Sequence, residues 1–286
     1  NYLFEASVGG GIPIIRPLCQ CLAANYIEGI AGILNGTTNF ILTMMIEEGM
    51  SFEEALKIAQ EKGYAEKDPT ADVEGHDACR KVCILASLAF GKHVYPNQVE
   101  TEGITKISLE DVSYIENAGG VIKLLGQIKY INDNEIAAFV SPAVVYNGSQ
   151  LASVKDVFNA ILVRGDAVGD VCFYGPGAGK LPTASAVVAD IIDCAKHSDR
   201  KKIFGWGEGS ENYVVDYKEK IEMPFYVRAK ATPNEVNSKF ADVKFLSRKG
   251  QPSDEVAFIT DYMTENKLNK KLDGMNVINT IKVTNY

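Results

Sequence analysis

A lysine and an aspartate stand one helical turn apart in a segment suited to acid–base chemistry. Asp77 and Lys81 are at positions i and i+4, so a helix would place their side chains on one face. The same face continues with the apolar residues Ile84 and Leu88, so we expect it to be buried one turn after the pair. One interpretation is a partly desolvated lysine that an aspartate holds ready for proton transfer. The other is an ordinary ion pair at a helix start, where aspartate also suits the helix dipole.

The segment before this pair is rich in carboxylates. Residues 63–77 carry five acidic side chains, which are Glu66, Asp68, Asp72, Glu74 and Asp77. Pro69 and Gly75 prevent a regular helix there, so we expect these acids on a loop that leads into the helix of residues 77–90.

A second segment of interest is glycine-rich and runs over residues 174–183. It is not a phosphate-binding P-loop, because three residues separate Gly175 from Gly179 and Leu181 stands where serine or threonine is required. It does not match the dinucleotide-binding pattern G-x-G-x-x-G either. Its backbone N–H groups precede an apolar helix over residues 184–195, and such a helix start favours an anionic group. The alternative is a tight turn.

A third segment combines Glu5 with the run Gly9-Gly10-Gly11. One carboxylate and several backbone carbonyls are the oxygen ligands that hard cations accept. The alternative is a sharp turn, which is the commonest use of a glycine run.

The composition narrows the class of protein. The 286 residues carry a net charge of −8, which argues against a nucleic-acid partner. No apolar run reaches the roughly 18 residues that span a bilayer, and the N-terminus has no signal-peptide pattern. The six cysteines form no CxxC pair, which favours reduced thiols. We therefore expect a cytoplasmic protein without a membrane partner.

The helices and strands that would position these segments indicate an α+β fold with two domains. Strands are expected at the N-terminus and over residues 27–34, 134–140 and 157–163, and helices over residues 17–24, 40–48, 52–62, 77–90 and 184–195, with one helix near Ile122. The pattern changes in the polar, glycine-rich residues 196–222. Beyond them, strands over residues 225–229, 243–246, 255–260 and 277–283 and a helix over 262–272 indicate a small α+β unit. The predicted domains are residues 1–205 and 222–286.

Four stretches together resemble the homoserine dehydrogenase family in order and spacing. They are residues 4–15, 32–40, 63–81 and 166–190, and the resemblance extends over roughly residues 2–200. It implies a catalytic and dimerisation domain with a mostly β sheet covered by helices. It also implies interconversion of L-homoserine and L-aspartate 4-semialdehyde with NAD or NADP, in the pathway to threonine, methionine and isoleucine.

The resemblance also implies roles for individual residues. Lys81 and Asp77 would be the catalytic pair, and the substrate would be bound by Glu66, Asp72, Tyr64 and Thr37. The cofactor would be faced by Gly175, Gly177 and Gly179. A monovalent cation such as sodium would be held by Glu5 and the carbonyls of Val8, Gly10 and Ile12. A homodimer is implied, and we expect it to form through the sheet that carries Phe139, Val140, Val144 and Val145.

The sequence departs from the family at both ends. Family members carry a nucleotide-binding domain with a G-x-G-x-x-G turn before this region, and we expect that its absence leaves this chain a poor binder of cofactor. The C-terminal unit resembles an ACT domain of βαββαβ order, which implies an amino-acid effector. Its usual Pro-Gly turn is missing, because Asn234 follows Pro233.

Two other functions are to be weighed. One is an amino-acid-sensing regulatory module with vestigial catalytic residues, against which the intact acidic loop and Lys81 argue. The other is aspartate-semialdehyde dehydrogenase, which needs a cysteine nucleophile beside a histidine base. We expect none of the six cysteines to have that role.

Overall fold

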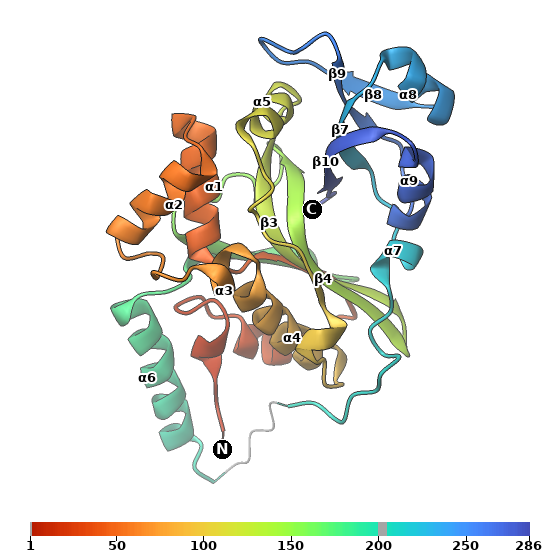
Figure 1. Cartoon of the computed structure of the whole chain (residues 1–286). Coiled ribbons are helices and arrows are strands. Elements are labelled where there is room, and N and C mark those ends of the chain that lie inside the picture. Colours follow the sequence, from red (N-terminus) through yellow and green to blue (C-terminus); the bar gives the residue numbers. More distant parts are fainter. Residues whose placement is uncertain (1, 200–204) are drawn as a thin grey trace.

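The computed structural model describes residues 2–199 and 205–286. The helices are α1 (Gly36–Glu48), α2 (Phe52–Glu61), α3 (Thr70–Val73), α4 (His76–Phe90), α5 (Leu109–Asn117), α6 (Lys180–Lys196), α7 (Tyr217–Lys220), α8 (Pro233–Lys239) and α9 (Glu265–Leu272). The strands are β1 (Ile27–Ile33), β2 (Glu100–Thr101), β3 (Gly120–Asn132), β4 (Glu135–Tyr146), β5 (Phe158–Gly165), β6 (Gly169–Pro176), β7 (Phe225–Lys230), β8 (Val243–Leu246), β9 (Glu255–Thr260) and β10 (Asn276–Val283). The expected α+β class is confirmed (Figure 1).

The ten strands of the described residues belong to one sheet. Its order is β6-β5-β1-β3-β4-β10-β7-β9-β8, and β2 pairs with β4 outside this path. Most neighbours are antiparallel, whereas β10 and β2 each run parallel to β4. The mostly β sheet covered by helices is therefore present, and the C-terminal strands β7 to β10 extend it.

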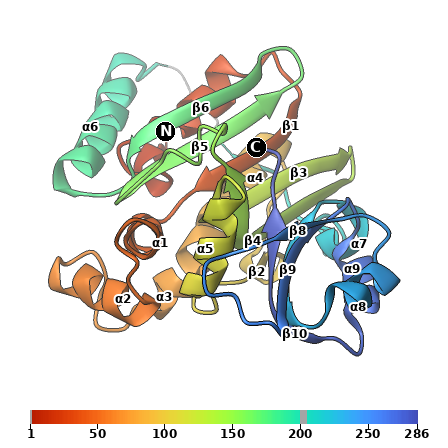
Figure 2. The same cartoon turned by 90° about the horizontal axis from the view of Figure 1, so that it is seen from above.

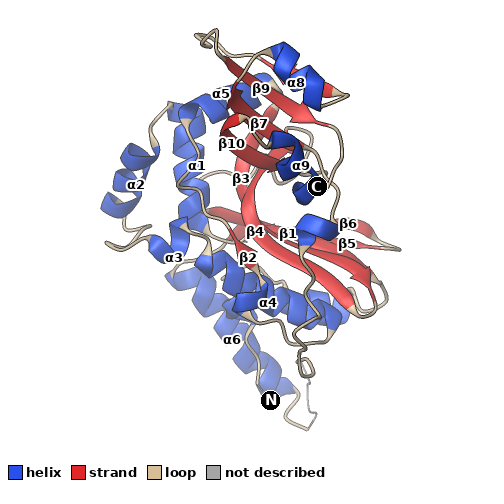
Figure 3. Cartoon of the chain, turned by 45° about the vertical axis from the view of Figure 1, so that its right-hand side comes forward, coloured by secondary structure: helices blue, strands red, loops and turns tan. Residues whose placement is uncertain are grey.

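Helices cover both faces of this sheet. Side chains alternate between faces along β4, so that Val140 and Val144 lie in one core cluster while Ala143 and Val145 lie in another. Helices α1 to α5 lie on the first face, and α7 to α9 lie on the other side beside the C-terminal strands (Figures 2 and 3). Helix α6 packs beside the short 3₁₀ helix Glu5–Ser7.

The C-terminal unit has the expected element order, β7-α8-β8-β9-α9-β10. Its last strand continues the sheet, with Lys282 opposite Ala143 and Val283 opposite Val144. A buried ion pair also crosses to α5, where Arg228 Nε lies 3.0 Å from Asp111 Oδ1. The division into residues 1–205 and 222–286 stays a prediction, as does the ACT-like character of the second unit.

Some expected elements differ in the structure. The helix predicted near Ile122 is wrong, because residue 122 lies in β3 and the helix is α5. Both faces of β3 are buried over residues 122–128, with the polar Lys123 and Gln127 included, so apolar and polar residues do not alternate regularly there and periodicity does not identify the strand. Ser108 starts α5 with a capping box to Asp111, which was the signal that could have placed it. Among residues 2–15 the structure has no strand, and β6 was not expected.

Two further expectations concern surfaces. Phe139, Val140, Val144 and Val145 are each at most 1% exposed within the single chain. They cannot form a dimer interface as they stand, so that detail of the prediction is wrong. No helix in residues 2–199 and 205–286 is long and apolar enough to cross a membrane.

Candidate active site

The predicted lysine–aspartate pair forms at the start of α4. Lys81 Nζ lies 2.7 Å from Asp77 Oδ2 and donates a second hydrogen bond, also 2.7 Å, to the carbonyl oxygen of Leu34. The side chains are 19% and 30% exposed, so neither is a freely solvated surface group. Ile84 and Leu88 pack against the main core on the same helix face, as the helical spacing predicted. Leu34 directly follows β1, so this contact ties the helix to the end of a central strand.

Asn35 joins this pair to the acidic loop. It is the N-cap of α1, and its Oδ1 accepts a hydrogen bond from the Thr38 N–H at 2.9 Å. Its Nδ2 donates to Asp72 Oδ1 at 2.7 Å and to Asp77 Oδ2 at 2.9 Å. Asn35 was not among the predicted site residues. The signal was available, because Asn followed by Gly-Thr-Thr is a good helix start.

Asp72 is an unusual carboxylate. Burial raises its pKa, hydrogen bonding to Asn35 opposes that shift, and the negative charge of Asp77 raises the pKa further. Lys81 acts on Asp72 only through a lesser electrostatic effect that lowers its pKa. The site thus holds two carboxylates beside one ammonium. A second cation would complete the charge balance.

The remaining predicted substrate residues lie at the N-terminal end of α1 or on the loop after α2. Thr37 Oγ1 donates to the carbonyl oxygen of Tyr64 at 2.7 Å, which joins the two segments. The Tyr64 ring lies edge-on to Phe40 with 5.1 Å between centroids. The Glu66 carbonyl accepts a hydrogen bond from Gln60 Nε2 at 3.0 Å, and its side chain is exposed. This carboxylate is therefore accessible to a molecule that binds beside the loop.

The two glycine-rich segments pack against each other. The Gly11 N–H donates to the carbonyl oxygen of Pro176 at 3.2 Å. A Cβ on Gly10 would lie 2.3 Å from the Gly177 oxygen, and a Cβ on Gly177 would lie 2.2 Å from Asn159 Cγ. Glycine is therefore required at both positions for the backbones to approach this closely. Gly175 lies in β6, and Gly179 is the N-cap of α6.

The sheet brings the glycine-rich loop toward the catalytic pair. Ile33 at the end of β1 is opposite Ala160 in β5, which is opposite Tyr174 in β6. Neighbouring strands lie about 4.8 Å apart, so the ends of β1 and β6 are separated by roughly 10 Å. These strands therefore bring two groups to the same end of the sheet. They are the Leu34 carbonyl that holds Lys81 and the turn after Tyr174.

Glu5 lies in a different environment from the one expected of a cation ligand. Its side chain is 3% exposed, and its two oxygens accept hydrogen bonds from the N–H groups of Ile14, Ile15 and Arg16 at 2.7 to 2.9 Å. Arg16 Nε adds a fourth contact at 3.2 Å. Four donors fill the acceptor positions of a carboxylate. In this geometry Glu5 does not fit as a cation ligand, and the cation site of Glu5, Val8, Gly10 and Ile12 stays a prediction.

Taken together, the fold and the site define an enzyme domain. A half-buried lysine is positioned by an aspartate, near a glycine-rich turn and beside Asp72, which has no ion pair among the described residues. This arrangement can transfer a proton to a substrate that carries a positive charge. Nothing in this geometry alone names the substrate.

Similarity to known proteins identifies the family. The homoserine dehydrogenase family model matches residues 13–192. The homoserine dehydrogenase of Synechocystis is 52% identical over 194 residues, which is 67% of this chain and 45% of that protein. The crystal structure of a homoserine dehydrogenase from Thiobacillus denitrificans has a TM-score of 0.86 at 36% identity and covers 98% of this chain and 69% of its own. The chain belongs to the homoserine dehydrogenase family.

A more distant structure carries a cofactor. It is a hyperthermophilic archaeal homoserine dehydrogenase mutant in complex with NADPH, with a TM-score of 0.56 at 31% identity over 68% of this chain and 55% of its own. The present chain spans less than half the length of the Synechocystis relative.

Proposed function

We propose that this chain is the substrate-binding and proton-transfer part of a homoserine dehydrogenase. The reaction is the NAD(P)-dependent interconversion of L-homoserine and L-aspartate 4-semialdehyde, a step toward threonine, methionine and isoleucine. The observation that carries the proposal is the Lys81–Asp77 pair at 2.7 Å, joined through Asn35 to a second carboxylate. Family membership supports the same reaction and not the regulatory module with vestigial residues.

The chemistry of the reduction suits these residues. Hydride addition to the aldehyde carbon places negative charge on the oxygen, and a nicotinamide supplies that hydride when bound. The ammonium of Lys81 stabilises this charge and then donates its proton to form the alcohol. Asp77 holds the ammonium in place, and the carbonyl of Leu34 fixes its direction.

The substrate ammonium would give Asp72 an ion-pair partner, which it does not have among the described residues. Asp72 has a pKa raised by burial, so a bound ammonium stabilises its charged form. Glu66 is exposed on the same loop and provides a second carboxylate. Thr37 and Tyr64 are joined by a hydrogen bond and line the same region.

The cofactor contacts that we propose for this chain are Gly175, Gly177 and Gly179. The tight packing of the loop against Gly10 and Asn159 supports a fixed backbone surface there. These 286 residues contain no G-x-G-x-x-G turn, so we propose that the remaining contacts to NAD or NADP come from outside them. Helix α6 adds support, because it exposes large apolar side chains that suit a packing partner, namely Leu181, Val187, Val188, Ile191 and Ile192.

Assembly and location follow from family membership as proposals. A cytoplasmic homodimer is the expected form, with an interface that avoids the buried positions of β4. The C-terminal unit would act as an ACT-like module with an amino-acid effector. Sedimentation of the chain at tens of micromolar tests the dimer, and a monomer alone would contradict it.

The activity is tested in the complete gene product that contains these residues. Homoserine oxidation is followed by nicotinamide absorbance with NAD and with NADP. We expect turnover with at least one cofactor, and Glu66→Gln should raise KM for homoserine more than it lowers kcat. A protein that binds homoserine but transfers no hydride to either cofactor would contradict the proposal.

A further inference from the structure

Three residues form a row across the sheet, on the face away from α1. Gly29 of β1 is opposite Lys129 of β3 on one side and Arg164 of β5 on the other. Side chains alternate between the two faces of a strand, so Gly29 shares its face with Ala31, which lies in a core cluster that also contains Tyr286. Because glycine has no side chain, the row leaves a gap between two cationic residues.

The ring of Tyr286 fills this gap. Arg164 Cζ lies 4.7 Å from the centroid of the ring, and Lys129 Nζ lies 5.8 Å from it. A Cβ on Gly29 would lie 2.4 Å from the Tyr286 hydroxyl oxygen, so the ring occupies the space that a side chain would take. Tyr286 is 8% exposed. A cation within about 6 Å of an aromatic centroid is attracted to the face of the ring, so both neighbours hold it.

The charges around the ring suit a neutral aromatic group. Arg164 is fixed from its far side, because its Nε and Nη2 donate to the two carboxylate oxygens of Asp170 at 2.6 and 2.9 Å. Burial lowers the pKa of Lys129, and the charge of Arg164 lowers it further. Burial raises the pKa of Tyr286 to about 12, so its phenol is neutral at pH 7. The ring therefore separates two like charges without adding one of its own.

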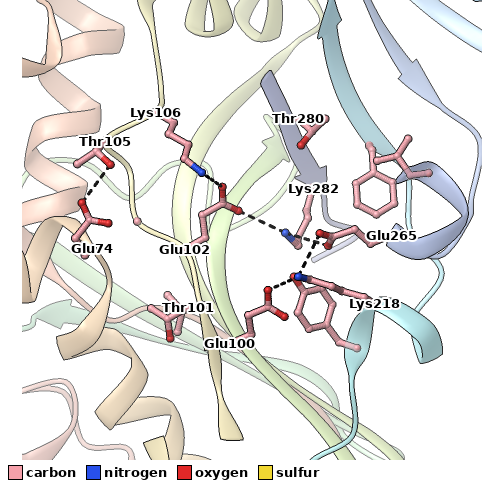
Figure 4. A pocket seen from close by; sticks show the side chains of 15 residues that line it. Glu74, Glu100, Thr101, Glu102, Thr105, Lys106, Lys218, Glu265, Thr280 and Lys282 are labelled. Atoms are coloured by element: carbon pink, nitrogen blue, oxygen red, sulfur yellow. Dashed lines mark hydrogen bonds and ion pairs between the residues drawn. The ribbon is translucent and has the colours of Figure 1, made fainter. Parts of the chain in front are cut away.

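The strand before Tyr286 is firmly held. Lys282 of β10 is 7% exposed, and its Nζ lies 3.7 Å from Glu102 Oε2 and 3.3 Å from Glu265 Oε2 (Figure 4). The next residue, Val283, pairs with Val144 of β4. These contacts join β10 to the segment after β2, to α9 and to β4, so the residues that follow start from a fixed position.

Residues 284–286 then cross β3 to reach β1. The Thr284 N–H donates to the Val144 carbonyl at 3.0 Å, and the Tyr286 N–H donates to Thr284 Oγ1 at 3.3 Å. β4 and β1 are two strand spacings apart, which is roughly 10 Å. Three extended residues cover about the same distance. The C-terminal unit thus reaches β1 and β5, beyond its own pairing with β4.

We propose that the row of Lys129, Gly29 and Arg164 is a binding site for an aromatic side chain. Tyr286 occupies this site as a clasp that holds the C-terminal unit to β1 and β5. The two cations attract the face of an aromatic ring, which an aliphatic side chain does not offer. The glycine supplies the space, and the fixed end of β10 supplies the ring at the correct position.

The clasp also reaches the strands that position the proposed site. β1 ends at Ile33, and the carbonyl of the next residue, Leu34, accepts a hydrogen bond from Lys81 Nζ at 2.7 Å. β5 pairs along its length with β6, which leads into the glycine-rich turn. A ring seated between β3 and β5 therefore restrains both strands, and the consequence of this for the site rests on the proposed function.

The binding site is tested on the chain itself by chemical rescue. Tyr286→Ala opens the gap, and 4-methylphenol is the probe because it is the tyrosine side chain without its backbone. We expect the variant to lose several degrees of Tm and about 10 mM 4-methylphenol to recover at least half of that loss, since a ligand that binds only the folded state stabilises it. Cyclohexanol has a similar size but no aromatic face, so it should recover much less. Equal recovery by the two compounds would overturn the proposal.

Further variants show where the probe binds. Adding Gly29→Ala to Tyr286→Ala fills part of the gap and should abolish the recovery. Tyr286→Phe keeps the ring and should retain nearly the wild-type Tm. Tyr262→Ala is the matched control, because Tyr262 belongs to the same unit but is 56% exposed. It should lose less Tm and should not respond to 4-methylphenol. Recovery that persists with Gly29→Ala, or a response in Tyr262→Ala, would place the probe elsewhere and overturn the proposal.

The clasp has a separate readout in hydrogen exchange. In Tyr286→Ala the backbone amides of β1 and β5 should exchange about tenfold faster, and those of β9 should change much less, because β9 lies in the C-terminal unit away from the row. Lys129→Met leaves Tyr286 in place and removes one cation, so it should give the same pattern with a smaller amplitude, and it replaces Tyr286→Ala if that variant does not fold. Equal acceleration in β1 and β9, or none in β1, would overturn the clasp. Neither measurement uses turnover, so a failure of the proposed function is distinguished from a failure of this inference.

Discussion

The side-chain amide of Asn35 donates a 2.7 Å hydrogen bond to Asp72. The same nitrogen reaches Asp77 at 2.9 Å, while the amide oxygen caps α1. One residue thus fixes the distance between the carboxylate proposed for the substrate and the carboxylate that holds Lys81. The two carboxylates repel each other, and a substrate ammonium would relieve that repulsion.

Asp72→Asn should stabilise the protein while it weakens substrate binding. The folded-state pKa of Asp72 is raised, so the folded protein binds this proton more tightly than the unfolded chain does. The contribution of Asp72 to stability is therefore lost as the pH rises from the pKa of Asp72 in the unfolded chain through its pKa in the folded protein. At pH 7 the charged carboxylate destabilises the fold, and asparagine removes that effect. Urea unfolding at pH 7 should give a higher midpoint, with the gain shrinking as pH falls toward about 4.

Asp68→Asn is the matched control, and its sign should be opposite. Asp68 is exposed, and hydrogen bonds from the Thr70 hydroxyl and N–H lower its pKa. Its charged form is stabilised by folding, so the substitution should cause a small loss of stability at pH 7. In the complete gene product, Asp72→Asn should also raise KM for homoserine, while Asp68→Asn should not. A loss of stability in Asp72→Asn at pH 7 would contradict the assignment of burial as the dominant effect.

Gly177→Ala should displace the glycine-rich loop. The new Cβ would lie 2.2 Å from Asn159 Cγ, and Asn159 is 1% exposed and cannot move aside. Overpacking of this kind costs about 1–3 kcal/mol. We expect KM for the nicotinamide cofactor to rise about tenfold in the complete gene product, an apparent loss of about 1.4 kcal/mol in binding. Gly148→Ala is the control, because no atom lies within 4 Å of its Cβ position. An unchanged cofactor KM would show that the loop does not face the cofactor.

Arg228→Met should destabilise the whole chain. The Arg228 side chain is 8% exposed and lies 3.0 Å from Asp111, which is fully buried. Removing one partner of a buried ion pair leaves an uncompensated charge and costs about 3–5 kcal/mol. Guanidinium unfolding should show this loss in a single transition, because the sheet is continuous through β10 and β4.

Lys267→Met supplies the comparison. Lys267 pairs with Glu222 at 3.0 Å, but both side chains are more than half exposed. Exposed ion pairs contribute about 1 kcal/mol or less. Equal losses in the two variants would show that the buried pair does not hold the C-terminal unit to α5.

The sequence was most informative where a local pattern decided the structure. The spacing of Asp77 and Lys81 and the apolar Ile84 and Leu88 predicted both the ion pair and its half-buried face. Capping residues and terminal glycines located α2 and α4 because they act within a few residues.

Features that depend on distant segments were not predictable in the same way. The parallel pairing of β10 with β4 is set by packing between distant parts of the chain, and no local pattern reports it. The contact of Gly10 with Gly177 is of the same kind. Glu5 shows the limit most clearly: its type suited a cation, while the structure surrounds it with the N–H groups of Ile14, Ile15 and Arg16.

The central claim is that Lys81 and Asp77 act as one proton-transfer unit, and kcat in a double-mutant cycle on the complete gene product tests it most directly. Lys81→Ala should lower kcat by about 10²-fold or more, the usual effect of losing a positioned acid. Asp77→Ala should also lower it, because the ammonium loses its 2.7 Å partner. The double variant should be little slower than Lys81→Ala alone, since the effects of residues that act together are not additive. A near-normal kcat in Lys81→Ala, together with loss of activity in the exposed neighbour Arg80→Ala, would contradict it.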